Sequence, residues 1–154
     1  MSDFHLAQYN IGRIRKPLDH PDVSEFKTAL GPINTLAEGS PGFVWRLTDD
    51  DGQSSSYVEV EGIDDPLLIV NYSIWNDLDS LKHFIHRSGH IAYLRRRLEW
   101  FEHSEEATSV AWWVPTGTIP NVSEAHQRLL YLREHGPTET GWPLTKPWPR
   151  PGHT

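Results

Sequence analysis

The chain has 154 residues, enough for one domain with a single core and too few for two. Its formal net charge of −7 argues against nucleic acid as a partner, because phosphate binding favours a basic surface. It contains no cysteine, which excludes disulfide bonds, thiolate nucleophiles and zinc–thiolate sites.

The N-terminal residues lack the basic start and apolar run of a signal peptide, and no stretch approaches the length of a membrane span. These features predict a cytoplasmic protein with no membrane partner. Seven tryptophans are many for a chain of this length. Such residues build cores or line pockets for small hydrophobic or aromatic ligands.

The first part of the chain alternates between strand and helix patterns. Residues 4–14 alternate in polarity, which is typical of a strand. Apolar residues then recur at helical spacing from Phe26 to Ala37, with a kink expected at Pro32. A Gly/Pro-rich stop precedes residues 43–47, which are predicted to form a short strand.

The strongest strand signal lies at residues 67–75, where a nearly continuous apolar run indicates a central strand buried on both faces. A helix capped by Asn76 or Asp77 should follow. It is interrupted at Ser88-Gly89, and a second helix begins there. The buried stripe of that second helix is predicted to be Ile91, Leu94, Leu98 and Phe101.

A last strand at residues 109–115 precedes a helix capped by Ser123 and ended by Gly136. The order βαββαβ predicts an α+β fold, one antiparallel sheet with helices on one face. The opposite face would be bare, so a second copy is expected to cover it in a homodimer. Residues 1–137 form this domain, and the proline-rich tail 138–154 packs on it or on a partner.

Several short motifs carry a resemblance to a known family. Together they resemble the bacterial domain of unknown function 3291 from Leu6 to about Trp142. The resemblance implies a dimeric α/β barrel built from ferredoxin-like halves, the superfamily of antibiotic-biosynthesis monooxygenases, haem-degrading monooxygenases and several haem enzymes. It brings no established catalytic residues. The motifs are residues 43–47, 71–75, 95–101 with His90, 112–115, Glu124, Arg128-Leu129 and 136–138.

Two residues on the predicted second helix are candidates for catalysis. His90 lies at the margin of the buried face, near the helix N-terminus, where the dipole would keep it neutral as a base. Arg97, two turns later, could hold an anionic substrate or stabilise an oxyanion. The alternative is a core-edge histidine bonded to backbone and an arginine in a structural ion pair.

Aromatic and polar strand residues are candidates for substrate binding. Asn71 and Ser73 are polar in an otherwise apolar strand, so they either bond to neighbours or face a cavity. With Trp45 and Trp75 they would form the wall of a pocket for a flat aromatic substrate, or an ordinary core and dimer interface. Arg46 projects away from Trp45 and is expected to pair with an acid. Tyr93 and Trp112 complete the predicted set.

The sequence predicts no metal site and no cofactor. His83, His86 and His90 would align only on an unbroken helix, and Ser88-Gly89 breaks it, so the first two are expected on a solvated face. Haem is the alternative, because it needs one axial histidine, with His90 the first choice. It would be noncovalent, since no c-type attachment motif exists.

The leading hypothesis is a small-molecule enzyme, a cofactor-independent monooxygenase acting on an aromatic or polyketide-like substrate. The alternatives are a haem-binding protein of the same fold and a non-catalytic ligand-binding dimer.

Overall fold

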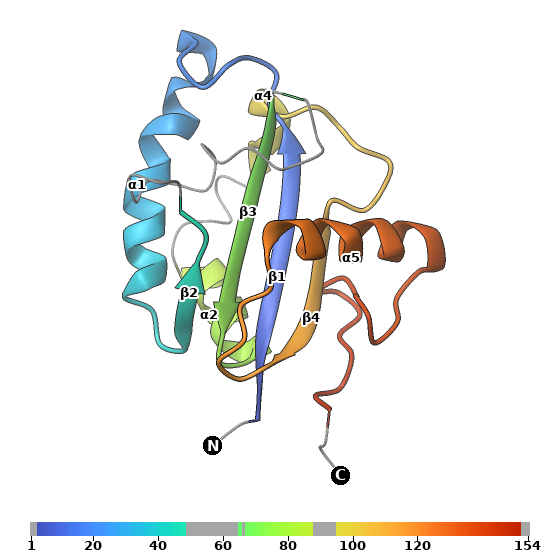
Figure 1. Cartoon of the computed structure of the whole chain (residues 1–154). Helices are drawn as coiled ribbons and strands as arrows, with labels where there is room; N and C mark the ends of the chain where they lie inside the picture. Colours follow the sequence, from blue (N-terminus) through green and yellow to red (C-terminus); the bar gives the residue numbers. More distant parts are fainter. Residues whose placement is uncertain (1–2, 49–64, 66, 88–94, 152–154) are drawn as a thin grey trace.

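A computed structural model of the chain describes residues 3–48, 65, 67–87 and 95–151. Four strands form one antiparallel sheet in the order β2-β3-β1-β4 (Figure 1). Because two βαβ halves that interleave in this way define the ferredoxin-like arrangement, the topology confirms the predicted α+β fold class.

The strands lie where the sequence predicts them. β3 is flanked by β1 and β2, and most of its side chains are buried on both faces, which confirms it as a central strand. The strands are β1 Phe4–Arg13, β2 Phe43–Arg46, β3 Leu68–Trp75 and β4 Ser109–Pro115.

The helices also follow the predicted order, with one different cap. The predicted cap of α2 is confirmed, since the Asp77 carboxylate accepts from the Ser80 N–H at 2.7 Å. The cap of α5 is Asn121 and not Ser123, because extended Asn121 directs its side-chain oxygen at the Glu124 N–H, 2.8 Å away. The elements are η1 Pro21–Val23, α1 Ser24–Glu38, α2 Leu78–Arg87, α4 Arg97–Trp100 and α5 Val122–His135.

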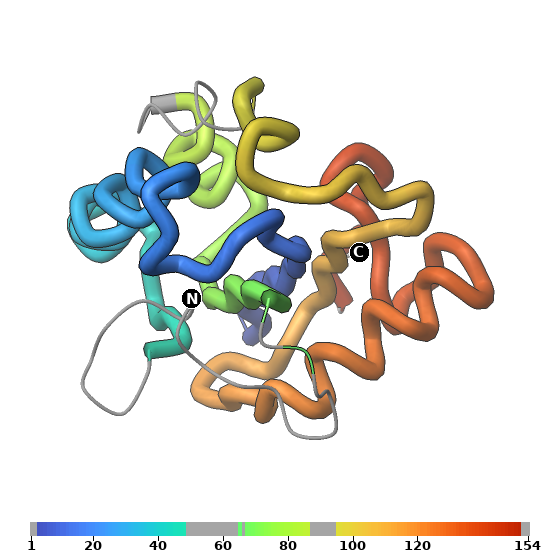
Figure 2. Tube along the Cα trace, turned by 90° about the horizontal axis from the view of Figure 1, so that it is seen from above, coloured from blue at the N-terminus to red at the C-terminus, as the bar shows by residue number. Residues whose placement is uncertain are grey.

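Helices α1 and α2 lie on one side of the sheet, and α5 lies on the other (Figures 1 and 2). Leu6 and Trp75 on the first side pack with Phe84 of α2; this side is called the α1/α2 face. Tyr9 and Trp112 on the opposite side pack beneath α5; this side is called the α5 face. The prediction that this face is bare is therefore wrong, because α5 folds back over it. The homodimer stays a prediction.

The C-terminal tail packs on the body of the protein. Trp142 and Ala111 of β4 exchange two backbone hydrogen bonds, of 2.8 and 2.9 Å. The Trp142 side chain is completely buried within the cluster on the α1/α2 face. The tail thus extends the sheet beside β4 and contributes a core residue.

The predicted buried stripe of the second helix is wrong at Leu98, which is 52% exposed. Trp100 is buried instead, against Ile14 and Val23. Helix α4 is a single short turn, and at Phe101 the chain becomes extended and pairs with Ile14 of the segment after β1. The pairing of Phe101 with Ile14 accounts for the burial of Trp100 in place of Leu98. Ile91 and Leu94 lie outside the described residues.

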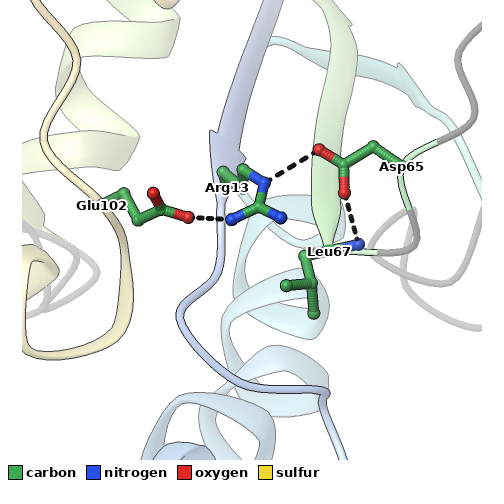
Figure 3. A network of polar contacts seen from close by, with 4 residues as sticks. All are labelled: Arg13, Asp65, Leu67 and Glu102. Carbon is green, nitrogen blue, oxygen red and sulfur yellow. Dashed lines mark hydrogen bonds and ion pairs between the residues drawn. The ribbon is translucent and has the colours of Figure 1, made fainter.

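An exposed ion-pair network ties together the end of the sheet near α4 (Figure 3). The Arg13 guanidinium binds Glu102 and donates to Asp65 at 3.0 Å. Asp65 also accepts from the Leu67 N–H at 3.0 Å, and this bond, with Arg13, lowers the pKa of its carboxyl group. Because the groups are partly solvated, the network contributes little stability but connects three chain segments.

Candidate functional site

Polar side chains cross the middle of the α1/α2 face. Strand pairing aligns Gln8 of β1 with Ser73 of β3, and Asn10 with Asn71. Residues directly opposite in an antiparallel pair point to the same face, so these four side chains lie together. With Trp75, the next residue of β3 on this face, they are called the amide network.

Hydrogen bonds connect every member of the amide network. The Gln8 Nε2 group donates to Asn71 Oδ1 at 2.7 Å and to Ser73 Oγ at 2.8 Å. Asn10 Nδ2 donates to Gln8 Oε1 at 2.8 Å, and Trp75 Nε1 donates to Ser73 Oγ at 2.9 Å. Gln8 is 5% exposed, so these bonds offset the cost of burying its amide.

Within the network Asn71 and Ser73 accept hydrogen bonds through their oxygens, and their own donor groups remain. Both Gln8 amide hydrogens and both Ser73 lone pairs are engaged, so the Ser73 hydroxyl hydrogen remains to be donated. Asn71 accepts through its oxygen, and within the described part of the chain its Nδ2 group has no acceptor. Asn71 is exposed, so its donor lies at the surface, whereas Ser73 beside it is buried. The site is suited to a ligand oxygen that accepts hydrogen bonds.

A positive charge lies beside the network. Arg46 of β2 is the register partner of Ser73 on the side away from Gln8. Its Nη2 atom is 3.6 Å from the Glu38 carboxylate at the end of α1, and its side chain is 14% exposed. The pair confirms the prediction that Arg46 points away from Trp45 and meets an acid.

The structure brings together three of the predicted substrate-binding residues, Asn71, Ser73 and Trp75. The Trp75 ring does not line an open pocket, because it is buried and stacks on Phe84 with ring centroids 5.2 Å apart. Its contribution to the network is therefore the indole N–H.

Trp45 and Trp112 lie on the opposite face, so a single pocket wall containing Trp45 and Trp75 is wrong. The pairing of β2 with β3 shifts between Phe43 and Trp45, which places Trp45 opposite Ile74 and not beside Ser73. There Trp45 packs against Tyr72, which stacks on Trp112; the centroid distances are 5.1 and 5.9 Å.

The predicted catalytic pair stays a prediction, because Arg97 is described and His90 is not. His90 and Tyr93 lie outside the described residues, and the Arg97 side chain on α4 is exposed. His83 and His86 are also exposed, in agreement with a solvated helix face. No group of three potential metal ligands occurs among residues 3–48, 65, 67–87 and 95–151.

Sequence reasoning missed Gln8 and Asn10, although a signal for them exists. Both share the strand face of Leu6, and the polar positions Asn71 and Ser73 needed partners on a neighbouring strand. Pairing the two polar stripes would have identified the network.

The haem alternative stays a prediction. Haem needs an axial ligand, and none of the described strand residues on the α1/α2 face is a histidine. The predicted axial ligand, His90, lies outside the described residues.

A Tyr–His pair lies on the α5 face, with Tyr9 buried and His126 half-buried. The Tyr9 hydroxyl is 2.9 Å from His126 Nδ1 on α5, and the two rings meet edge to face. Burial raises the pKa of Tyr9 above its usual range and, with the nearby Arg133 charge second, lowers the pKa of His126. Both groups are therefore neutral at pH 7, and the pair holds α5 against the sheet.

Comparison with known proteins identifies a family. The family described as domain of unknown function (DUF3291) matches residues 5–154. No functionally curated protein is significantly similar to the chain. Among solved structures, a candidate antibiotic biosynthesis monooxygenase from Nitrosomonas europaea is similar, with a TM-score of 0.48 and 10% identity. The match covers 79% of this chain and 97% of that one.

Proposed function

Because the chain belongs to the DUF3291 family, whose description names no reaction, we propose a function from the amide network. The chain is a small-molecule enzyme, a cofactor-independent monooxygenase that oxidises an aromatic or polyketide-like substrate with O2. The observation that supports this proposal is the pair of remaining donors on Ser73 and Asn71.

Donors of this kind favour a developing oxyanion. Gln8 fixes the Asn71 and Ser73 oxygens as acceptors, so their hydrogens are oriented before a ligand arrives. Fixed donors beside an enolate or phenolate oxygen stabilise it without reorganisation, and removing one such donor typically lowers kcat by about 10²–10³. The Ser73 hydroxyl is buried, where such a bond is stronger than in water.

The chemistry needs no cofactor when the substrate supplies the electrons. For an anthrone-type substrate, loss of the C10 proton places an electron pair on the conjugated oxygen, which the two donors hold. The carbanion then reduces O2 and forms a C–O bond, and the hydroperoxide loses water to give the quinone. One O2 is consumed, with one oxygen atom in the product and one in water. His90 stays the predicted base.

The experiment is oxygen uptake with anthrone as the substrate. We expect the purified protein to accelerate O2 consumption above the buffer rate, with one anthraquinone formed per O2. Asn71→Asp, which replaces the amide donor by an acceptor oxygen, should lower the rate by about tenfold or more. The control is Ser104→Ala, which alters an exposed residue outside the amide network and should leave the rate unaltered.

The proposal fails if neither anthrone nor 1,8-dihydroxyanthrone is oxidised faster than in buffer. It also fails if Asn71→Asp retains the full rate while remaining folded, because the network would then have no part in the reaction. Circular dichroism of each variant separates these outcomes from misfolding.

A further inference from the structure

We infer that the chain has a second small-molecule site, which binds a free amino acid with an aromatic side chain. The site is a cavity of about 300 Å³ where the tail meets β4 and α5 (Figure 1). It is called the tail cavity, and none of its lining residues belongs to the amide network, so the inference does not depend on the proposed function. The lining includes Trp113, Arg128, Glu139, Thr140, Trp148 and Pro149.

Arg128 of α5 supplies a fixed cation at the tail cavity. Its Nε atom donates to the Glu124 carboxylate at 3.2 Å, and its Nη1 atom donates to the Thr140 carbonyl oxygen at 2.7 Å. The guanidinium also lies over the Trp112 ring, 5.1 Å from its centroid. A guanidinium has five N–H donors, and these contacts with described residues use two of them. The remaining donors suit a carboxylate, because a planar guanidinium can donate two parallel hydrogen bonds.

The ion pair with Glu124 does not cancel the attraction of Arg128 for a ligand. The Arg128 side chain is 28% exposed and that of Glu124 is 48% exposed, so water screens the pair. Partly solvated pairs of this kind contribute little free energy. Their main effect here is to orient the guanidinium before a ligand arrives.

Glu139 supplies the opposite charge on another wall of the tail cavity. It lies at the turn of a hairpin in which Thr138 and Gly141 exchange two backbone hydrogen bonds of 3.1 Å. The hairpin packs closely on its neighbours, because a Cβ atom at Gly141 would lie 2.6 Å from Val110 and 3.3 Å from the Arg128 carbonyl oxygen. Within the described part of the chain, the Glu139 carboxylate forms no hydrogen bond or ion pair, not even with Arg128. It can therefore accept hydrogen bonds from an ammonium group.

Two tryptophans form much of the apolar wall. Trp113 Nε1 donates to the Trp148 carbonyl oxygen at 2.8 Å, and the Arg150 guanidinium lies 4.7 Å from the centroid of the Trp113 ring. These contacts hold Trp113 in place. Trp148 is 41% exposed, and an aromatic ring bound in the cavity would cover part of this apolar surface.

These three parts match the three parts of an aromatic amino acid. Its carboxylate meets Arg128, its ammonium group meets Glu139, and its ring packs on the two tryptophans. A ligand with only one charge leaves one of the two charged side chains without a counter-charge. The volume is at the small end of the range of about 300–1,000 Å³ for small-molecule pockets, which favours a single amino acid over a peptide.

The test compares L-phenylalanine with three probes that each lack one of its parts. The first, 3-phenylpropionate, has no ammonium group; phenethylamine has no carboxylate; and L-alanine has no ring. Isothermal titration calorimetry measures the affinities. The indole signals of Trp113 and Trp148 in 1H–15N NMR spectra report whether a probe binds in the tail cavity, and Trp113→Phe and Trp148→Phe assign these signals.

For the wild-type chain we expect L-phenylalanine to shift both indole signals and to bind at least about tenfold more tightly than each probe. Glu139→Gln changes an exposed side chain, so the fold should be preserved. It should weaken L-phenylalanine by about tenfold and leave 3-phenylpropionate within about twofold. Arg128→Lys keeps the charge without the planar fork and should weaken L-phenylalanine but not phenethylamine. Glu105→Gln, which alters an exposed acid outside the cavity, is the matched control and should behave as wild type.

Equal binding of L-phenylalanine and the three probes overturns the inference, as does an L-phenylalanine titration that shifts neither indole signal. Unaltered L-phenylalanine affinity in folded Glu139→Gln overturns it too, and this variant decides the matter even if Arg128→Lys does not fold. Shifts confined to the side-chain amide signals of Gln8 and Asn71 would place the amino acid at the amide network and refute the tail cavity as its site.

Discussion

Replacing Gln8 by leucine tests the amide network as a structural unit. Leucine has nearly the volume of glutamine but neither donates nor accepts. The change removes three hydrogen bonds, to Asn71, Ser73 and Asn10. Because Gln8 is buried at the centre of the sheet, water cannot take its place.

The expected loss of stability is about 1–2 kcal/mol. Each hydrogen bond contributes about 1 kcal/mol net, but Asn71 and Asn10 are partly exposed and recover bonds to water. Ser73 is buried, loses one donor and keeps that of Trp75. Burial of the leucine side chain offsets part of the remaining cost. For a domain of this size the loss corresponds to a decrease in Tm of about 2–8 °C.

Urea unfolding of the wild-type chain, Gln8→Leu, Ser73→Ala and the double variant measures the effect. Because Gln8 and Ser73 share a hydrogen bond, the two changes should be non-additive by about 0.5 kcal/mol or more. Gln127→Leu, which alters an exposed glutamine of α5, is the control and should change stability little. A loss below about 0.5 kcal/mol for Gln8→Leu, or strict additivity, would refute the reasoning.

Two further predictions concern the opposite face and the tail. Because burial lowers the pKa of His126 below its usual 6.5, the folded state resists protonation, and stability should fall as the pH drops from about 6.5 toward that lower pKa. Thermal unfolding across this range should show the fall weakened in His126→Gln and retained in the exposed control His103→Gln. An unchanged profile in His126→Gln would contradict the reasoning from the burial of this imidazole. Trp142→Ala should cost about 3–5 kcal/mol in urea unfolding, because the side chain is completely buried, whereas Trp148→Ala should cost far less; equal losses would contradict the assigned packing.

Most of the sheet follows from local patterns. The alternation in residues 4–14 and the apolar run in 67–75 predict β1 and β3 within a residue or two, because burial of a strand face directly selects the side chains on it. The covering of the second face was not predictable in this way. Helix α5 returns over the sheet after β4, and amphipathic spacing does not specify which face a terminal helix covers.

The candidate site was predictable in part. Asn71 and Ser73 stand out as polar residues in an apolar strand, and the structure joins them through Gln8. The assignment of Trp45 to the same wall failed because one shift in strand pairing reverses the faces of the residues beyond it. Such a shift depends on cross-strand contacts, which a single strand's sequence does not contain.

The pairing of Trp142 with Ala111 has a consequence for how the chain avoids self-association. β4 is an outer strand of the sheet, and an uncovered outer strand offers unpaired N–H and C=O groups to any other extended chain. The tail satisfies both backbone groups of Ala111 from within the molecule. Shortening the chain before Trp142 would expose this strand as a template for intermolecular pairing, so tags and truncations that disturb the tail risk aggregation even where the remaining core is intact.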